Sequence, residues 1–206
     1  MGHFKMLYNE ELMYIRCTKC ANSSLTDFFL NNDFRLLLPK SRKQHIDIIR
    51  QFSGEVIAVI RNPFSRLVSS FFDKMNPNVG IDDASVYIKN VFPSWYKIGI
   101  RHDTNIDQFV KIISDVPDYK IDHHLSSQSF RYLDKNNRLL INRLIPIEKL
   151  SEEIENLKDK YRLDGEVTKK NKVNHPSYSD ILTNQSTMDR IYQRYKMDFE
   201  ITSYKF

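Results

Sequence analysis

A lysine and several small polar residues occupy a predicted turn between a strand and a helix. The segment Arg16–Leu25 reads Arg-Cys-Thr-Lys-Cys-Ala-Asn-Ser-Ser-Leu and follows an apolar run at residues 12–17. Amides at a helix N-terminus have no intrahelical partner, and the helix dipole is positive there, so such a turn binds phosphate or sulfate. Lys19 would add a point charge, and Ser23 and Ser24 would add hydroxyl donors. The candidate anion ligands are Lys19, Cys20, Ala21, Asn22, Ser23 and Ser24. The competing interpretation is a capped helix whose lysine faces water.

A second basic segment follows the next predicted buried strand. It reads Arg-Asn-Pro-Phe-Ser-Arg-Leu-Val-Ser from Arg61 to Ser69. In an open α/β sheet, ligands bind at the carboxyl ends of strands, so Arg61 and Ser69 could hold a second phosphate. The alternative is that Arg61 and Arg66 belong to the solvated start of a helix.

These two segments need a sheet to position them. Continuous apolar runs predict strands, and each is followed by helical spacing of apolar residues. The predicted strands are 12–17, 34–38, 55–60 and 139–147. Capping residues indicate where helices begin, and the predicted pairs are Asn62 with Pro63, Thr104 with Asp107, and Ser186 with Asp189. This alternation predicts a three-layer α/β fold, with a central parallel sheet flanked by helices, in a single domain over residues 1–206.

Composition limits the function classes. The 206 residues are 41% hydrophobic with a net charge of +5, which favours a globular chain with an anionic partner. No apolar run is long enough to span a bilayer, and the first residues lack a signal peptide, so we expect a cytoplasmic protein. A secretory-pathway lumen is the alternative if the chain is a fragment. Oligomeric state cannot be derived from the sequence.

Both basic segments resemble those of Golgi-type carbohydrate sulfotransferases, such as the heparan sulfate 2-O- and chondroitin or dermatan 4-O-sulfotransferases. Thr18–Ser24 is similar to their Pro-Lys-x-x-x-Thr/Ser loop, with threonine in place of proline, and Arg61–Ser69 matches their Arg-Asp/Asn-Pro-Phe-x-Arg-Leu-Val-Ser pattern almost throughout. Weaker similarities occur at Asp122–Gln128, Pro146–Leu150 and in the C-terminal residues.

The resemblance implies a P-loop-like sulfotransferase fold and 3′-phosphoadenosine-5′-phosphosulfate (PAPS) as donor. It implies that residues 19–24 wrap the 5′-phosphosulfate, and that Arg61 and Ser69 bind the 3′-phosphate. The expected reaction moves the sulfuryl group to a hydroxyl, most readily on a carbohydrate, and leaves 3′,5′-adenosine bisphosphate. The expected partner is that acceptor rather than a nucleic acid.

Sulfuryl transfer needs a base for the proton of the acceptor and positive charge on the departing oxygen. The reaction requires no metal in principle, and the resemblance assigns the second role to Lys19. His45 is a candidate base because it lies between the two phosphate segments along the chain, as the base does in the heparan 2-O group. His124 is the alternative candidate base, because its spacing to Gln128 is similar to that between a histidine and a glutamine in the family. Residues 172–174 correspond to a loop that could cover the donor.

Two other functions remain open. Cys17-Thr-Lys-Cys20, between a strand and a helix, is also typical of a thiol-disulfide oxidoreductase. The basic charge alone would also suit a non-catalytic module that binds nucleic acid or anionic glycans. The glycine-rich nucleotide-hydrolase loop is absent from the sequence, which disfavours an ATPase or kinase.

Overall fold

The computed structural model describes residues 4–75, 84–168 and 176–206. The chain forms two compact units, each built from two separate stretches. Unit 1 comprises Met1–Arg61 and Gln128–Lys172, and unit 2 comprises Asn62–Ser127 and Val173–Phe206. The single domain over residues 1–206 stays a prediction.

Unit 1 is built on a five-stranded mixed sheet with the order β3-β1-β2-β4-β5. Its strands are β1 (Met6–Tyr8), β2 (Leu12–Ile15), β3 (Arg35–Leu37), β4 (Glu55–Ile60) and β5 (Arg143–Pro146). β2, β4 and β5 run parallel, whereas β1 is antiparallel to both of its neighbours. The sequence analysis located β4 correctly, missed the short β1, and gave β5 too many residues.

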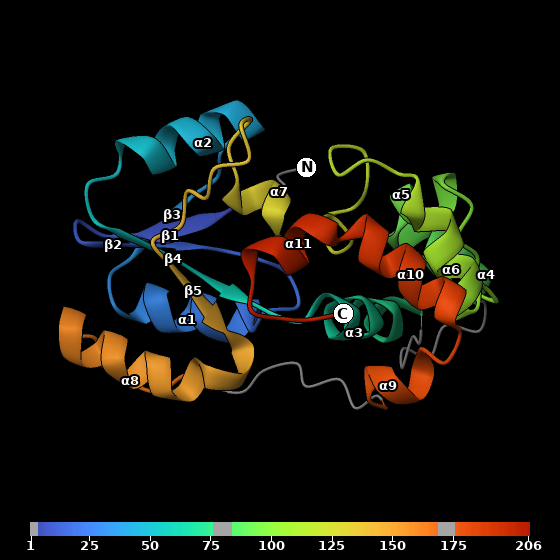
Figure 1. Ribbon diagram of the computed structural model, residues 1–206. Coiled ribbons are helices and arrows are strands. Elements are labelled where there is room, and N and C mark those ends of the chain that lie inside the picture. The colour runs from blue at the N-terminus through green and yellow to red at the C-terminus, as the bar shows by residue number, and fades with distance from the viewer. Residues whose placement is uncertain (1–3, 76–83, 169–175) are drawn as a thin grey trace. The chain divides into compact units, whose positions relative to one another are not determined.

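Helices cover both faces of this sheet and form the two outer layers of the three-layer unit. The helices of unit 1 are α1 (Asn22–Asn31), α2 (Arg42–Gln51), α7 (Ser129–Tyr132) and α8 (Leu150–Tyr161), the last preceded by a 3₁₀ turn at Ile147–Lys149. Figure 1 shows α1 and α8 on one face, and α2 and α7 on the other. The predicted α/β class is therefore confirmed. Because β2 and β4 are parallel, the loop before α1 and the residue after β4 lie at the same edge of the sheet.

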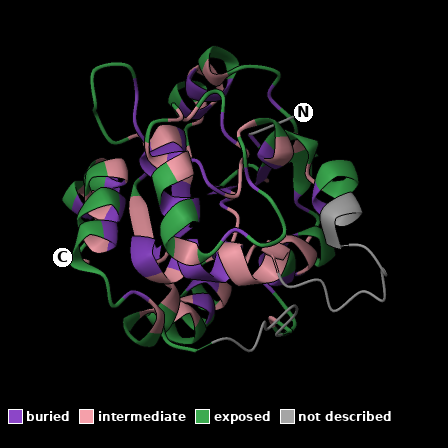
Figure 2. Ribbon diagram, turned by 90° about the vertical axis from the view of Figure 1, so that its right-hand side faces the viewer, coloured by how far each residue is buried: buried purple, intermediate pink, exposed green. Residues whose placement is uncertain are grey.

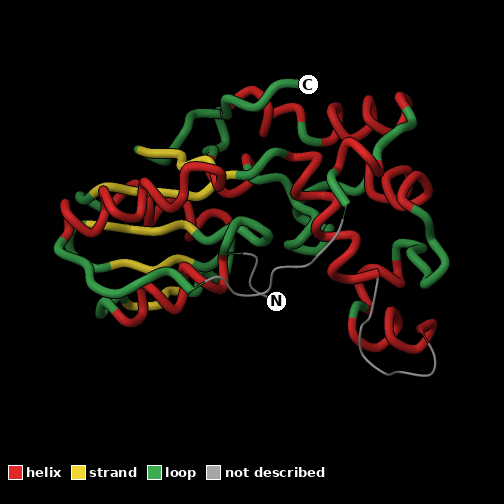
Figure 3. Tube along the Cα trace, turned by 90° about the horizontal axis from the view of Figure 1, so that it is seen from below, coloured by secondary structure: helices red, strands yellow, loops and turns green. Residues whose placement is uncertain are grey.

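Unit 2 consists of helices and loops in its described part, as Figure 3 shows. Its helices are α3 (Pro63–Met75), α4 (Ala84–Val91), α5 (Pro93–Lys97), α6 (Ile106–Ser114), α9 (Tyr178–Ile181), α10 (Gln185–Arg194) and α11 (Lys196–Ile201). They enclose an aromatic core in which Trp95 and Phe109 are fully buried. Exposed and buried residues occupy different faces of these helices in Figure 2, as expected for helices packed around one core.

The helix caps agree with the sequence analysis at one site and differ at two. Asn62 caps α3 as predicted, its Oδ1 accepting from the amide of Phe64 at 2.9 Å. The capping box of α6 uses Asn105 and Gln108 rather than Thr104 and Asp107. Helix α10 is capped by Asn184, not by Ser186 with Asp189. In both helices, polar residues close to the predicted cap offered an equivalent local signal, so the sequence pattern alone did not distinguish them. None of the helices described is both long and apolar enough to cross a bilayer.

Candidate functional site

The loop before α1 has the backbone of an anion-binding turn. Lys19 and Ala21 adopt left-handed conformations, with φ of 65° and 54°. Such conformations cost non-glycine residues about 1 kcal/mol or more each, and they cluster at ligand-binding turns. Ala21 provides no side-chain cap for α1, and the first turn of the helix contains no acidic residue. The first turn of α1 therefore carries no side chain that would repel an anion.

Arg61, at the end of β4, lies beside this loop. Its Nη1 donates to the main-chain carbonyl of Lys19 at 3.2 Å. Arg61, the first residue of the second predicted phosphate-binding segment, therefore meets the first segment within unit 1, although Lys19 and Arg61 are 42 residues apart in the sequence. The guanidinium of Arg61 and the N-terminus of α1 together make a positive region that suits a phosphorylated ligand.

Gln128 ties the two segments together. Its Oε1 accepts from the main-chain amide of Arg61 at 3.0 Å, and its Nε2 donates to the main-chain carbonyl of Arg61 at 2.9 Å. The same Oε1 lies 3.5 Å from the Sγ of Cys20. The side chain of Gln128 is fully buried, so these bonds hold without competition from water.

Arg16 fixes the far side of the loop. Its Nε donates to the Oδ1 of Asn22 at 2.8 Å. The Asn22 side chain, at the first residue of α1, is thereby held by Arg16. Ser23 and Ser24 follow in the first turn of α1, and Ser24 is only 6% exposed.

Both cysteines are free thiols in the packed interior. Cys17 and Cys20 are 1% and 0% exposed. A thiol-disulfide oxidoreductase needs an accessible, electropositive attacking thiolate. Their burial favours a packing role for this Cys-x-x-Cys pair.

Every residue of the Arg61–Ser69 segment after Arg61 lies in unit 2. Ser69, on α3, is 4% exposed, and its part in donor binding stays a prediction. Arg66 is 1% exposed rather than solvated, so the alternative interpretation fails for this residue. Its Nη2 donates to the carbonyls of His124 at 3.3 Å and Ser126 at 2.8 Å. Ser70 Oγ also donates to the His124 carbonyl, at 3.1 Å.

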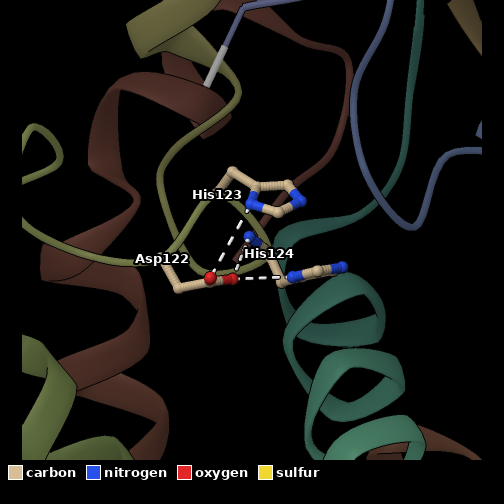
Figure 4. Close-up of side chains that lie close together, drawn as sticks. All are labelled: Asp122, His123 and His124. Atoms are coloured by element: carbon tan, nitrogen blue, oxygen red, sulfur yellow. Dashed lines mark hydrogen bonds and ion pairs between the residues drawn. The ribbon is translucent and has the colours of Figure 1, made fainter. Parts of the chain in front are cut away.

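The turn that Arg66 and Ser70 anchor contains Asp122, His123 and His124, shown in Figure 4. His124 Nδ1 lies 2.6 Å from Asp122 Oδ1, which also accepts the His124 main-chain amide at 2.9 Å. Burial opposes the ionisation of Asp122, but the bonds from His124 outweigh it and hold the pKa of this carboxyl below its usual range. Asp122 is therefore an anion that orients the His124 ring.

His45 has a different environment. It lies on α2 in unit 1, 1% exposed, with its ring stacked on Phe4 at a centroid distance of 4.6 Å. Its Nε2 is 2.8 Å from the carbonyl of Arg131, so Nε2 is the donor. Burial lowers the pKa of His45 to about 4. The ring is thus neutral at physiological pH and is enclosed by the protein.

Sequence reasoning did not identify Gln128 and Arg66 as supports of the site. Both residues lie inside the motifs that carried the family resemblance, and this position was the only feature of the sequence that could have indicated their importance. Their partners are main-chain atoms, which no side-chain pattern reveals. The predicted lid at residues 172–174 lies outside the described residues.

Comparison with known families extends these local similarities to the whole chain. The model described as the sulfotransferase family matches residues 2–205. The chain belongs to the sulfotransferase family. No curated protein and no solved structure matches it. The Golgi carbohydrate sulfotransferases belong to the same family, so the resemblance predicted from the motifs is confirmed. This sulfotransferase is accordingly a transferase of sulfuryl groups, and its five-stranded sheet with flanking helices agrees with that fold.

Proposed function

We propose that this sulfotransferase takes the sulfuryl group from PAPS and transfers it to a hydroxyl of a carbohydrate. The observation that supports the donor is the meeting of Arg61 with the Lys19 loop. An arginine beside a separate anion-binding turn suits a nucleotide with phosphates at two positions. A nucleotide with only a 5′-phosphate would leave one of them without a ligand.

The residues of unit 1 divide the work on the donor. The main chain of residues 19–24, at the positive end of α1, binds the 5′-phosphosulfate. Lys19 stabilises the charge that develops on the oxygen between phosphorus and sulfur as that bond breaks. Arg61 holds the 3′-phosphate, and the resemblance assigns Ser69, in unit 2, to the same phosphate. Gln128 maintains the distance between the two phosphate sites through both main-chain polar groups of Arg61.

His124 is proposed as the base. Asp122 holds the ring proton on Nδ1, so Nε2 carries the lone pair that accepts the proton of the attacking hydroxyl. The enclosed ring of His45 offers no comparable access, since it is 1% exposed. Replacing His124 with glutamine is expected to lower the transfer rate by a factor on the order of 10²–10⁴. Donor affinity should stay unchanged, and His102→Gln, at an exposed histidine, is the control.

Competitive calorimetry with 3′,5′-adenosine bisphosphate and AMP tests the donor. The bisphosphate should bind more tightly, and Arg61→Met should weaken it by roughly 10- to 100-fold through loss of a charged hydrogen bond. AMP binding should change much less. Arg35→Met, at an exposed arginine on β3, is the matched control. Equal affinities of the wild type for both nucleotides would refute the donor assignment.

A non-catalytic module for anionic polymers is the second candidate, favoured only by the net charge of +5. It predicts affinity that falls steeply with salt and no preference for a 3′-phosphate. Incubation with sulfur-labelled donor and a panel of hydroxyl acceptors distinguishes the two candidates. Label should enter carbohydrates first, ahead of lipid-linked sugars, small alcohols and peptide tyrosine. The cytoplasmic location stays a prediction.

A further inference from the structure

The turn at residues 122–124 presents three metal-binding side chains together. The Nδ1 or Nε2 atoms of His123 and His124 and a carboxylate oxygen of Asp122 all lie within 4.8 Å of one another. Figure 4 shows both rings beside the carboxylate. Two imidazole nitrogens and one carboxylate oxygen form a ligand set that suits Zn²⁺ and leaves a fourth position for water.

The turn is held in place before any ion binds. Its main chain closes through the amides of Leu125 and Ser126, which donate to the carbonyl of Asp122 at 2.9 and 3.0 Å. The buried guanidinium of Arg66 and the hydroxyl of Ser70 hold the carbonyl of His124 from α3. A ligand set on a fixed main chain loses little conformational entropy on binding a metal.

The three side chains are also accessible. Asp122 and His124 are 17% and 18% exposed, and His123 is 41% exposed. His123 Nδ1 lies 3.7 Å from Asp122 Oδ2, a separation that an ion between them could bridge with small side-chain rotations.

We propose that Asp122, His123 and His124 form a site for a divalent transition metal such as Zn²⁺, and that the bound ion inhibits sulfuryl transfer. The inhibition rests on the proposed function, in which His124 is the base. The ion replaces the proton on His124 Nδ1 as the partner of that nitrogen. The neutral ring then carries its proton on Nε2, where no lone pair remains to accept a proton from the acceptor. The base is therefore blocked by a change of tautomer.

A single substitution separates metal binding from transfer. His123→Phe removes one ligand but keeps a ring beside His124, whose centroid lies 4.1 Å from that of His123. Full-length protein without a polyhistidine tag is titrated with ZnCl₂ in a calorimeter and with Co²⁺ in a visible spectrometer. The wild type should bind one equivalent of each ion. His123→Phe should bind Zn²⁺ at least about tenfold more weakly. The control His102→Phe, at an exposed histidine outside the turn, should bind like the wild type.

Transfer assays then test the consequence of binding. In chelator, His123→Phe and the wild type should transfer label at similar rates, whereas Zn²⁺ at a concentration that saturates the wild type should inhibit only the wild type. Absence of stoichiometric Zn²⁺ binding, or equal binding by His123→Phe, would overturn the site. Zn²⁺ that binds without slowing transfer would overturn the inhibition. Failure of the proposed function is seen separately, as absence of transfer in chelator, because calorimetry measures metal binding without the reaction.

Discussion

Replacing His45 with phenylalanine is expected to remove a large part of the acid sensitivity of the fold. Burial lowers the pKa of His45 from its ordinary 6.5 to about 4. Below the ordinary value, the unfolded chain takes up a proton that the folded protein refuses. The free energy of unfolding must therefore fall as the pH falls from about 6.5 to about 4, and change no further below that window.

The size of this effect follows from the two pKa values. Their difference corresponds to about 3 kcal/mol, at about 1.36 kcal/mol per pH unit. Between pH 7 and about pH 4.5, the free energy of unfolding of the wild type should fall by about 2 kcal/mol more than that of His45→Phe. The phenylalanine keeps the stacking on Phe4 but leaves the carbonyl of Arg131 without its donor. That cost is about 1–3 kcal/mol and does not depend on pH.

Urea unfolding of both proteins across this pH range measures the difference directly. Parallel pH dependences would refute the reasoning, since they would mean that His45 titrates normally in the folded protein. His102→Phe, at an exposed histidine, should leave the pH dependence unchanged. The same variant tests the assignment of the base: folded His45→Phe should transfer sulfuryl groups, and loss of transfer would restore His45 as the candidate.

Three further substitutions test the donor site and the sheet. Lys19→Ala should lower the transfer rate by a factor on the order of 10²–10³, measured with labelled donor, because the departing oxygen loses its positive partner; an unchanged rate would exclude that role. Gln128→Leu should weaken binding of 3′,5′-adenosine bisphosphate by about tenfold or more in calorimetry, since both main-chain groups of Arg61 lose their buried partner, whereas Gln128→Glu should retain the bond from the amide of Arg61 and be weakened less. Gly54→Ala should reduce the free energy of unfolding, measured in urea, by about 1–3 kcal/mol. The added Cβ would lie 2.2 Å from the main-chain oxygen of Glu11, which accepts a hydrogen bond from the amide of Glu55. An unchanged free energy of unfolding would show that the main chain at the start of β4 moves to accommodate the methyl group.

The parts of the site that could be predicted are those encoded by neighbouring residues. The β-branched run Glu55–Ile60 and the cap at Asn62 each depend on a few adjacent side chains, and both predictions are confirmed. The order strand, loop, helix around Lys19 also follows from local periodicity. The short strand β1 was missed, because three residues give too few positions for a period to be recognised.

The support of the site could not be predicted in this way. Gln128 reaches Arg61 across 67 residues and Cys20 across 108. Arg66 binds carbonyls 58 and 60 residues along the chain. Main-chain carbonyls carry no sequence signature, so only the folded arrangement shows why these polar side chains are buried.

The sequence by itself determined the family, the α/β class and the two segments proposed to bind the donor, because apolar periodicity and basic motifs are encoded in contiguous residues. The tertiary structure decided which histidine is enclosed and which is paired with a carboxylate. His45 and His124 are the same residue type, and their difference arises from packing on Phe4 in one case and from the turn at Asp122 in the other. Burial and hydrogen-bond partners are set by segments that are distant in sequence, and these in turn set the protonation and reach of each ring.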